Sequence, residues 1–450
     1  MNFATLSRRA RTWVPRGAAL AAIAASAAAC DLDLTDPNAP GEDEVLNSPQ
    51  LVLTTAIGLQ AQYAENVHIF VRAPALLTDE WGTRPIALEA DRSLVVGNID
   101  PGYGVVSDPF AAAYRIARTA DLLIEAAPRV QLGTELRVGT TALARTIKAM
   151  AIGNLTTQYQ ELPVNFDTAG APPVPRDQVR DSVIAMLELA RAEVGTLTDA
   201  QLIAFNNAVN LSSAGLTGGT STIRGISLRN TINAMLARYY LFDGQYQQAI
   251  DAAARVNLAV PSVITYPNPG VNPIFNYGFS LNYVGTRKSF FTEAETRLGG
   301  DKRPAYWANR GAGVAGVPDS VFAFRRYGGR NDEFPLYLPD EMRLIQAEAY
   351  ARLNQLAPAR ALINAVRTQC TSTVDEPTAC FSGPLTDAEL ATQAQVLTQI
   401  LYERRYELYA QGLRLEDVRR LREFTPKRPT ADFLPYPASE CQRNPNAGCA

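Results

Sequence analysis

Residues 400–424 read ILYERRYELYAQGLRLEDVRRLREF, a segment in which charged side chains alternate with large apolar ones. Glu403 and Glu407 are one helical turn apart with arginines beside them, which favours ion pairing over a catalytic carboxylate pair with a raised pKa. The charges continue across the turn at Gly412, so we expect a structural ion-pair network that fixes the last two long helices. Its expected members are Glu403, Arg404, Arg405, Glu407, Arg414 and Asp417.

Apolar residues recur with helical spacing along most of the remaining chain, which predicts a mainly α fold. The main exceptions are the acidic, breaker-rich stretch after Cys30 and the segment at about 258–338. We expect helices at about residues 49–67, 109–127, 135–159, 176–194, 227–242, 245–257, 339–353, 358–368, 387–410 and 413–424.

Two of the predicted helix pairs resemble each other. Residues 233–256 read NAMLARYYLFDGQYQQAIDAAARV, and residues 343–367 read RLIQAEAYARLNQLAPARALINAVR. Each has alanines where paired helices touch, a polar turn in the middle and an apolar face on both sides, as in the tetratricopeptide helix–turn–helix unit. Such units are normally tandem, whereas these two are separated by the segment at about 258–338. The sequence predicts a scaffold of tetratricopeptide-like pairs interrupted by a long insertion.

The insertion is rich in glycine, proline and aromatic residues and has few helical stretches. A long loop-rich segment in a compact helical protein is usually functional or disordered, and this many aromatics argue against disorder. For any single aromatic, packing against the helices is the expected role, but we expect a subset on the surface. The aromatics are Tyr266, Phe275, Tyr277, Phe279, Tyr283, Phe290, Phe291, Tyr306, Trp307, Phe322, Phe324, Tyr327 and Tyr337.

The N-terminus has the layout of an export signal, with a basic start and an apolar run that ends in AASAAAC at Cys30. We expect residues 1–29 to be a signal peptide, Cys30 to be lipidated, and residues 30–48 to form an acidic tether. A lipobox usually has Leu three residues before the cysteine, where this chain has Ala27, so plain secretion stays open. The stretch SRRART also leaves the twin-arginine export route open.

Charge and cysteine content narrow the possible functions. The whole chain has a net charge of −3, which becomes −7 when residues 1–29, with four arginines and no acid, are removed. Binding to nucleic acid is therefore not expected. Apart from Cys30, the cysteines form two close pairs in polar stretches of an exported chain, which favours two disulfides over a zinc site. Three connectivities are possible, of which Cys370 with Cys380 and Cys441 with Cys449 is favoured.

Residues that would carry catalysis are scarce. The only histidine, His68, lies in an apolar helical stretch, so no Ser-His-Asp or Cys-His arrangement and no histidine-based metal site is expected. The glycine-rich stretch GLTGGTSTIRG, residues 215–225, lacks the lysine of a phosphate loop. Asp79 and Glu80 beside Trp81 are the other carboxylate pair that a cleft could use. We expect neither catalysis nor a cofactor.

The segment 400–424 closely resembles the signature of the SusD/RagB family of cell-surface nutrient-binding lipoproteins, in which E-R-R-x-E-L is followed by a glycine turn and R-x-x-D-x-x-R. The departures are Gln411, where the family usually has Glu, and Leu415 with Glu416, where it favours aromatics. The matching residues are Glu403, Arg404, Arg405, Glu407, Leu408, Gly412, Arg414, Asp417 and Arg420.

Other segments extend the resemblance over nearly all of the chain after Cys30. FLPYPASECQRNPN at 433–446 is similar to the closing motif of the family, and residues 342–367 resemble its second strong block. Residues 110–128 and 143–164 look like its N-terminal helices. The resemblance implies one SusD-like domain over residues 49–450, with the insertion at about 258–338 and the signature region at about 339–450.

The resemblance also implies a location, a partner and a ligand. The protein would be held by lipid on the outer leaflet of a Gram-negative outer membrane and face the cell exterior. It would act with a SusC-like TonB-dependent transporter. Its ligand would be an oligosaccharide or, as in some relatives, a peptide, with no hydrolysis, metal or cofactor. A glycoside hydrolase and a plain tetratricopeptide-type interaction scaffold are the alternatives from other classes.

The resemblance implies that an N-terminal loop, which here contains Trp81, and the insertion both contribute to the ligand face. Trp81 and Trp307 occur in polar, turn-rich contexts, TDEWGTRP and KRPAYWANRG, and flat aromatic rings match the apolar faces of sugars. We therefore expect stacking by Trp81, Tyr306 and Trp307 and hydrogen bonding by Asp79, Arg84 and Asn309.

Overall fold

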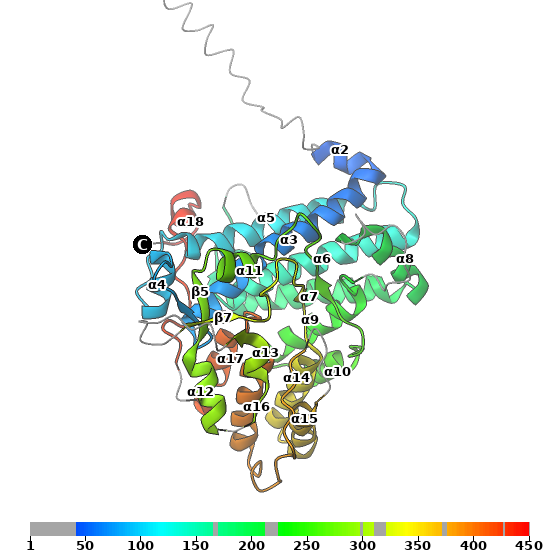
Figure 1. The fold of residues 1–450 in the computed structure, drawn as a ribbon. Coiled ribbons are helices and arrows are strands. Elements are labelled where there is room, and N and C mark those ends of the chain that lie inside the picture. The colour runs from blue at the N-terminus through cyan, green and yellow to red at the C-terminus, as the bar shows by residue number, and fades with distance from the viewer. Residues whose placement is uncertain are drawn as a thin grey trace, which may run out of the picture. The chain divides into compact units, whose positions relative to one another are not determined.

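The computed structural model describes residues 42–164, 170–211, 224–297, 300–309, 321–370, 376–425 and 428–449. The fold is mainly helical, as the sequence predicts, and the strands in the described part of the chain are short (Figure 1). Cys30, the predicted signal peptide and most of the predicted tether lie outside the described residues. Contacts within the chain separate Met1–Glu44 from a compact unit, Val45–Ala450, whose architecture follows.

The first half of this unit is built from long helices that pack on one another in chain order. These are α3 (Pro49–Leu77), α5 (Gly104–Ala126), α6 (Thr134–Thr156) and α7 (Arg176–Gly195), with α6 lying against both α5 and α7. The helix α3 extends well beyond the expected end at residue 67 because its last residues, from Phe70 to Leu77, are all buried. The shorter helices here are α2 (Glu42–Asn47), α4 (Glu89–Val96) and α8 (Asp199–Val209).

The two similar helix pairs are α9 (Leu228–Phe242) with α10 (Tyr246–Ala254), and α14 (Pro339–Arg352) with α15 (Leu356–Thr368). Although the insertion separates them in sequence, α10 packs directly against α14 in space. Ala249, Ala253, Ala347 and Ala359 are fully or almost fully buried, which agrees with close packing of paired helices. Ala361, which the same pattern places at a helix contact, is instead exposed. The pairs therefore stack as tandem tetratricopeptide-like units do, with the insertion leaving the stack between them.

The signature segment forms α16 (Gln393–Glu407) and α17 (Arg414–Arg420), followed by a 3₁₀ turn at Arg422–Phe424 and later by α18 (Ala438–Arg443). The helix α16 starts later than the sequence suggests because Thr392 and Gln395 form a capping box at its N-terminus. Gly412 has a positive φ of 75°, and a side chain there would meet the Phe70 carbonyl oxygen of α3. This explains the glycine in the turn between α16 and α17.

The insertion contains a small antiparallel sheet that the sequence did not predict. Its strand order is β1 (Trp81–Thr83), β5 (Val284–Arg287), β7 (Val321–Phe324) and β6 (Ala308–Asn309), so one strand comes from the N-terminal half of the chain. Gly82 pairs with Gly285, and a Cβ on Gly285 would lie 2.4 Å from the Phe322 carbonyl oxygen. The close strand approach therefore requires glycine. Short helices α11 (Pro273–Phe275), α12 (Lys288–Arg297) and α13 (Arg303–Trp307) and a π-turn at Asn276–Ser280 complete the insertion.

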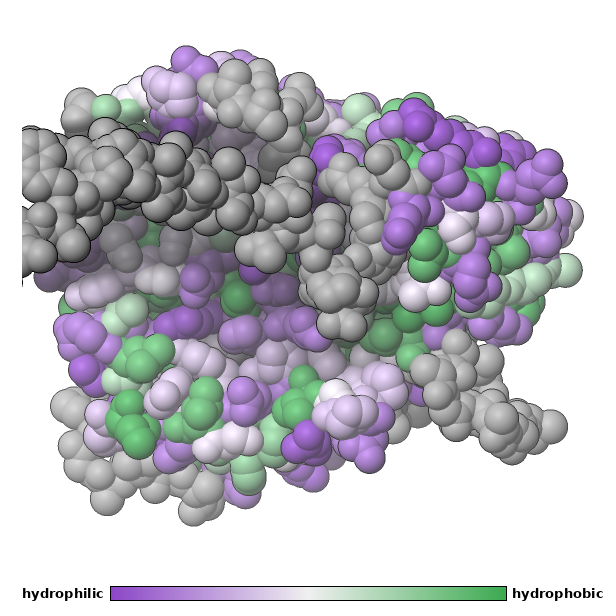
Figure 2. Space-filling model, turned by 90° about the horizontal axis from the view of Figure 1, so that it is seen from above, coloured by the Kyte–Doolittle hydropathy of each residue, from purple (hydrophilic) through white to green (hydrophobic). Residues whose placement is uncertain are grey.

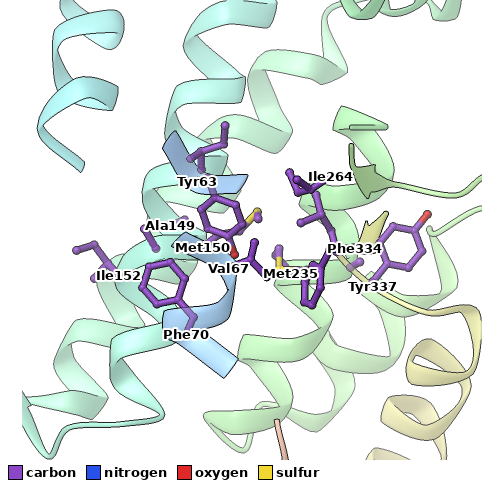
Figure 3. Close-up of a cluster of buried hydrophobic side chains, with 14 of the residues drawn as sticks. Tyr63, Val67, Phe70, Ala149, Met150, Ile152, Met235, Ile264, Phe334 and Tyr337 are labelled. Carbon is purple, nitrogen blue, oxygen red and sulfur yellow. The ribbon is translucent and has the colours of Figure 1, made fainter. Parts of the chain in front are cut away.

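Two further strand pairs lie outside this sheet: β2 (Glu161–Leu162) with β3 (Val174–Pro175), and β4 (Val263–Ile264) with β8 (Phe334–Pro335). The pair β4–β8 joins the base of the insertion to the helical core. Figure 3 shows Ile264 and Phe334 from these strands near Met235 of α9, Met150 of α6 and Val67 of α3. The main hydrophobic core thus runs from the long helices into the insertion, which is anchored at both of its ends.

The surface seen in Figure 2 intersperses hydrophilic and hydrophobic residues. Among the helices of the described residues, none combines the length and the apolar character that crossing a membrane would require.

Candidate ligand-binding cleft

The signature segment forms a buried ion-pair network. Its charged side chains pair with residues of other helices and of the insertion, and not with adjacent residues of the same helix. Arg404 pairs with Asp417 at 2.9 Å, and both side chains are almost completely buried. Arg420 of α17 reaches Glu348 of α14 at 2.7 Å. Consecutive residues on a helix point in different directions, so the network connects α16 and α17 to other elements more than to each other.

Arg303 of the insertion is the partner of the signature glutamates. Its guanidinium lies 2.7 Å from a carboxylate oxygen of Glu403, 2.9 Å from one of Glu407 and 2.8 Å from one of Asp301, all with fully buried side chains. Arg367 of α15 also pairs with Glu403, at 3.0 Å. Burial raises the pKa of Glu407 well above its ordinary value. The glutamates therefore hold the insertion on the scaffold and are not placed as a catalytic pair.

The second candidate carboxylate pair is also structural. The Asp79 carboxylate forms ion pairs with two buried arginines, Arg414 at 2.9 Å and Arg405 at 3.1 Å. Glu80 is 1% exposed, and burial raises its pKa to about 8. Arg84 is also buried, and burial lowers its pKa. None of the three lines the cleft along α12, α13 and β6. Asp79 and Arg84 therefore do not lie where the sequence analysis expected them, beside a bound ligand.

The prediction that Trp81 and Trp307 stack on a ligand at the surface is wrong, because both side chains are 0% exposed. The Trp81 ring packs 5.1 Å from that of Phe324, and the Trp307 indole N–H donates to the Tyr406 carbonyl oxygen at 2.6 Å. Their polar, turn-rich sequence contexts are covered by the sheet and by α16, which sequence alone does not reveal. The Trp307 indole therefore connects the insertion to the signature helix α16, whereas Trp81 packs against the sheet of the insertion.

A cleft opens beside Trp307, along α12, α13 and β6. One part has a volume of about 510 Å³ and the adjoining part about 810 Å³. They form one continuous cleft because four residues line both parts, namely Gly300, Asp301, Ala305 and Arg325. The first part is additionally lined by Phe291, Ala294, Glu295, Pro304, Ala308 and Asn309. The second part is additionally lined by Lys302, Tyr306, Arg326, Asp332 and Thr378.

Two of the sequence-predicted ligand residues lie in this cleft. Tyr306 is half-buried at the second part, where its ring meets the Trp307 indole edge-on at a centroid distance of 4.9 Å. Asn309, the last residue of β6, is exposed at the first part. Trp307 therefore supports Tyr306 from behind, while Tyr306 faces the cleft. Of the two adjacent aromatics, Tyr306 lies at the cleft and Trp307 does not, and ligand binding by Tyr306 and Asn309 stays a prediction.

The cleft has one apolar wall and one cationic wall. Phe291, Ala308 and Phe322 form a small separate cluster of buried apolar residues under the first part. Lys302 and Arg325 border the second part. The sequence analysis did not propose Lys302 or Arg325 as site residues, although Lys302 lies in the stretch KRPAYWANRG, four residues before Tyr306.

The cysteines pair as neighbours, Cys370 with Cys380 and Cys441 with Cys449. The first disulfide lies beside the cleft, because the Lys302 ammonium donates to the Cys380 sulfur at 3.4 Å. His68 packs against Tyr277 at a centroid distance of 5.7 Å, and burial lowers its pKa to about 4. Among the residues that the structure describes, no group of three or more His, Cys, Asp or Glu side chains is placed to hold a metal ion.

Stacked helix pairs that carry a cleft on a loop-rich insertion define a SusD-like fold. Several solved structures share it. A SusD superfamily protein from Bacteroides thetaiotaomicron aligns with a TM-score of 0.65 at 16% identity, covering 88% of this chain and 98% of that one. A SusD-like carbohydrate binding protein from Bacteroides vulgatus has a TM-score of 0.65 at 15% identity, with 88% and 97% covered. B. fragilis NanU aligns with a TM-score of 0.65 at 16% identity, covering 92% of this chain and 98% of that one.

The family resemblance is confirmed by a second comparison. The model of the SusD family matches residues 298–431, which run from the end of α12 through the cleft residues to the segment after α17. The chain therefore carries a SusD-family region within a SusD-like fold. No curated protein matches the chain.

Proposed function

We propose that the protein is a cell-surface lipoprotein that binds a nutrient, first of all an oligosaccharide, in the α12–α13–β6 cleft and passes it to a SusC-like TonB-dependent transporter. The observation that carries the proposal is Tyr306, a half-buried aromatic ring at the wall of a cleft that also presents Asn309. An aromatic face with nearby amides and charged groups matches the C–H faces and hydroxyl rims of sugars. The SusD-like neighbour described as carbohydrate binding supports the same ligand class.

The alternatives make different demands on the site. A peptide-binding member of the family would use the same cleft, so the ligand panel must contain peptides. A glycoside hydrolase would need two free carboxylates about 5 to 9.5 Å apart across the cleft. Against that alternative, two of the carboxylates that line the cleft are engaged, Asp301 by Arg303 and Asp332 by Arg326. Asp79, Glu403 and Glu407 do not line the cleft and pair with buried arginines. A plain interaction scaffold would bind through the helix stack and would not depend on Tyr306.

The test is calorimetric titration of the protein with a panel of oligosaccharides and peptides, using wild type, Tyr306→Ala and Asn309→Ala. We expect Tyr306→Ala to weaken binding of the ligand by roughly 1 to 3 kcal/mol. The matched control is Tyr246→Ala, which removes a half-buried tyrosine on α10 that does not line the cleft. Equal affinities of wild type and Tyr306→Ala for every ligand would refute the assignment of the cleft. Co-purification of a TonB-dependent barrel from the native membrane would test the partner.

A further inference from the structure

Two cations that border the second part of the cleft form no ion pair with a carboxylate among the residues that the structure describes. Lys302 donates to the Cys380 sulfur, and Arg325 donates to the Ala305 carbonyl oxygen at 3.0 Å. Within the described part of the chain, no carboxylate forms an ion pair with either side chain. Both residues are exposed on the cleft. Two unpaired cations on one wall are notable in a chain whose net charge is −3.

The acidic groups of the same part of the cleft are already engaged. Asp301 pairs with Arg303 at 2.8 Å, and its side chain is completely buried. Asp332 lies 4.0 Å from Arg326 and accepts a hydrogen bond from the Gly329 backbone N–H. Both carboxylates are therefore already engaged by cations other than Lys302 and Arg325. The wall formed by Lys302, Arg325 and Tyr306 retains a positive character.

The first part of the cleft differs from the second in polarity and charge, so the two ends of a bound ligand would meet different surroundings. Its wall is formed by Phe291, Ala294 and Ala308, and its exposed charged side chain apart from Arg325 is the acidic Glu295. A ligand with an anionic group would therefore place that group beside Lys302 and Arg325. The remainder of the ligand would extend toward Phe291 and Asn309.

From this arrangement we infer that the nutrient is an acidic oligosaccharide, whose carboxylate or sulfate group is bound by Lys302 and Arg325 while Tyr306 contacts the adjacent ring. This inference rests on the proposed function and names its ligand class. Guanidinium and ammonium groups form charge-assisted hydrogen bonds with oxyanions, about twice as strong as neutral ones. Tyr306 offers the aromatic face that a sugar ring uses, which favours an acidic glycan over an acidic peptide.

The experiment is calorimetric titration with matched pairs of ligands. The probes are trimers of galacturonate, glucuronate and mannuronate, each with its carboxyl-reduced neutral counterpart, together with a sulfated trisaccharide and an Asp-Glu peptide. We expect at least one acidic glycan to bind about tenfold or more tightly than its neutral counterpart, with an affinity that falls as salt increases. Lys302→Gln and Arg325→Gln should each reduce that preference, whereas Arg115→Gln, which removes an exposed cation on α5, should not.

The outcomes separate this inference from the proposed function. Binding of neutral glycans in a Tyr306-dependent manner, with no preference for the acidic probes, would overturn the acidic class and leave the proposed function standing. A preference for the acidic peptide would overturn the glycan assignment. If no glycan or peptide bound at the cleft, both proposals would fail. Circular dichroism of each variant would verify that the fold is intact, because Lys302 and Arg325 are exposed and make no buried ion pair.

Discussion

The guanidinium of Arg303 lies 2.7 Å from the carboxylate of Glu403, and both side chains are completely buried. Arg303 begins α13, the helix that presents Tyr306 to the cleft, whereas Glu403 lies in the middle of α16. The ion pair therefore joins the cleft to the rigid helical scaffold. Substitutions at such anchoring residues should lower stability, whereas substitutions at residues that contact the ligand should lower affinity.

Replacing Arg303 by methionine should lower the free energy of unfolding by roughly 3 to 5 kcal/mol, because buried carboxylates would lose their cation. Denaturant unfolding of the purified protein measures this difference. The control is Arg92→Met, which breaks an exposed pair with Glu89 and should cost about 1 kcal/mol or less. Similar losses in the two variants would contradict the assignment of Arg303 as a structural anchor.

Arg405→Ala should lower the melting temperature without selectively weakening ligand binding. Arg405 is buried between Asp79 and Glu293, so it connects α16 to the end of α3 and to α12. Thermal unfolding and a titration at a temperature where the variant is folded measure the two effects separately. Unchanged stability together with lost binding would instead move Arg405 into the ligand site.

Glu80→Gln should alter the pH dependence of stability. Burial raises the pKa of Glu80 from 4.5 to about 8 in the folded protein, so the folded state retains a proton that the unfolded chain releases. The contribution of Glu80 to stability is therefore complete below about pH 4.5 and is lost as pH rises toward 8. The variant should gain stability relative to wild type over this range, on the order of a few kcal/mol.

Denaturant unfolding at several pH values between 4.5 and 8.5 would test this, with the difference between the two proteins as the readout, because other titrating groups cancel in that difference. Glu89→Gln is the control, since it makes the same substitution at an exposed glutamate. A difference between Glu80→Gln and wild type that stays constant with pH would exclude the raised pKa.

Trp81→Ala and Trp307→Ala should each cost about 3 to 5 kcal/mol of stability, because both remove a fully buried indole from the main hydrophobic core. Tyr306→Ala should show the opposite pattern, with a small change in stability and a large loss of affinity. Unfolding curves and titrations of the three variants give this comparison directly. A tryptophan variant with unchanged stability would show that the indole is not packed as described.

Cys30→Ser should release the protein from membranes or leave its precursor uncleaved, because the thiol is the expected site of lipid attachment. Detergent phase separation of cell fractions measures the partitioning. A serine variant that still enters the detergent phase would rule out lipidation at this residue.

The helical scaffold could be predicted from sequence because helical periodicity is a local signal. The helix pairs α9–α10 and α14–α15 were found from their alanines and turns, with ends displaced by a few residues. The strands β1, β5, β6 and β7 were missed because each has only two to four residues, and β1 pairs with a strand about 200 residues away. Such pairing leaves no periodic pattern in so short a segment.

Only two of the residues predicted to bind ligand, Tyr306 and Asn309, lie at the cleft, because exposure depends on what packs against a residue. Trp307 and Tyr306 are adjacent in sequence and in the same polar context, yet α16 covers the indole and leaves the phenol at the cleft. Arg303 is similarly indistinguishable from Lys302 in sequence, although the first neutralises buried carboxylates and the second borders the cleft. Long-range contacts decide each case, and a single sequence does not display them.

The direct packing of α10 on α14 has a consequence for how this protein can change over time. Residues 255–338 leave the stack and return to it at adjacent positions, so their length is not constrained by the stack itself. Doubling the length of a flexible loop costs only about 0.6 kcal/mol in closure entropy. A lineage could therefore lengthen the loops beside the cleft and change what the cleft accepts, provided that residues such as Arg303, which pair with the buried carboxylates of the scaffold, are kept.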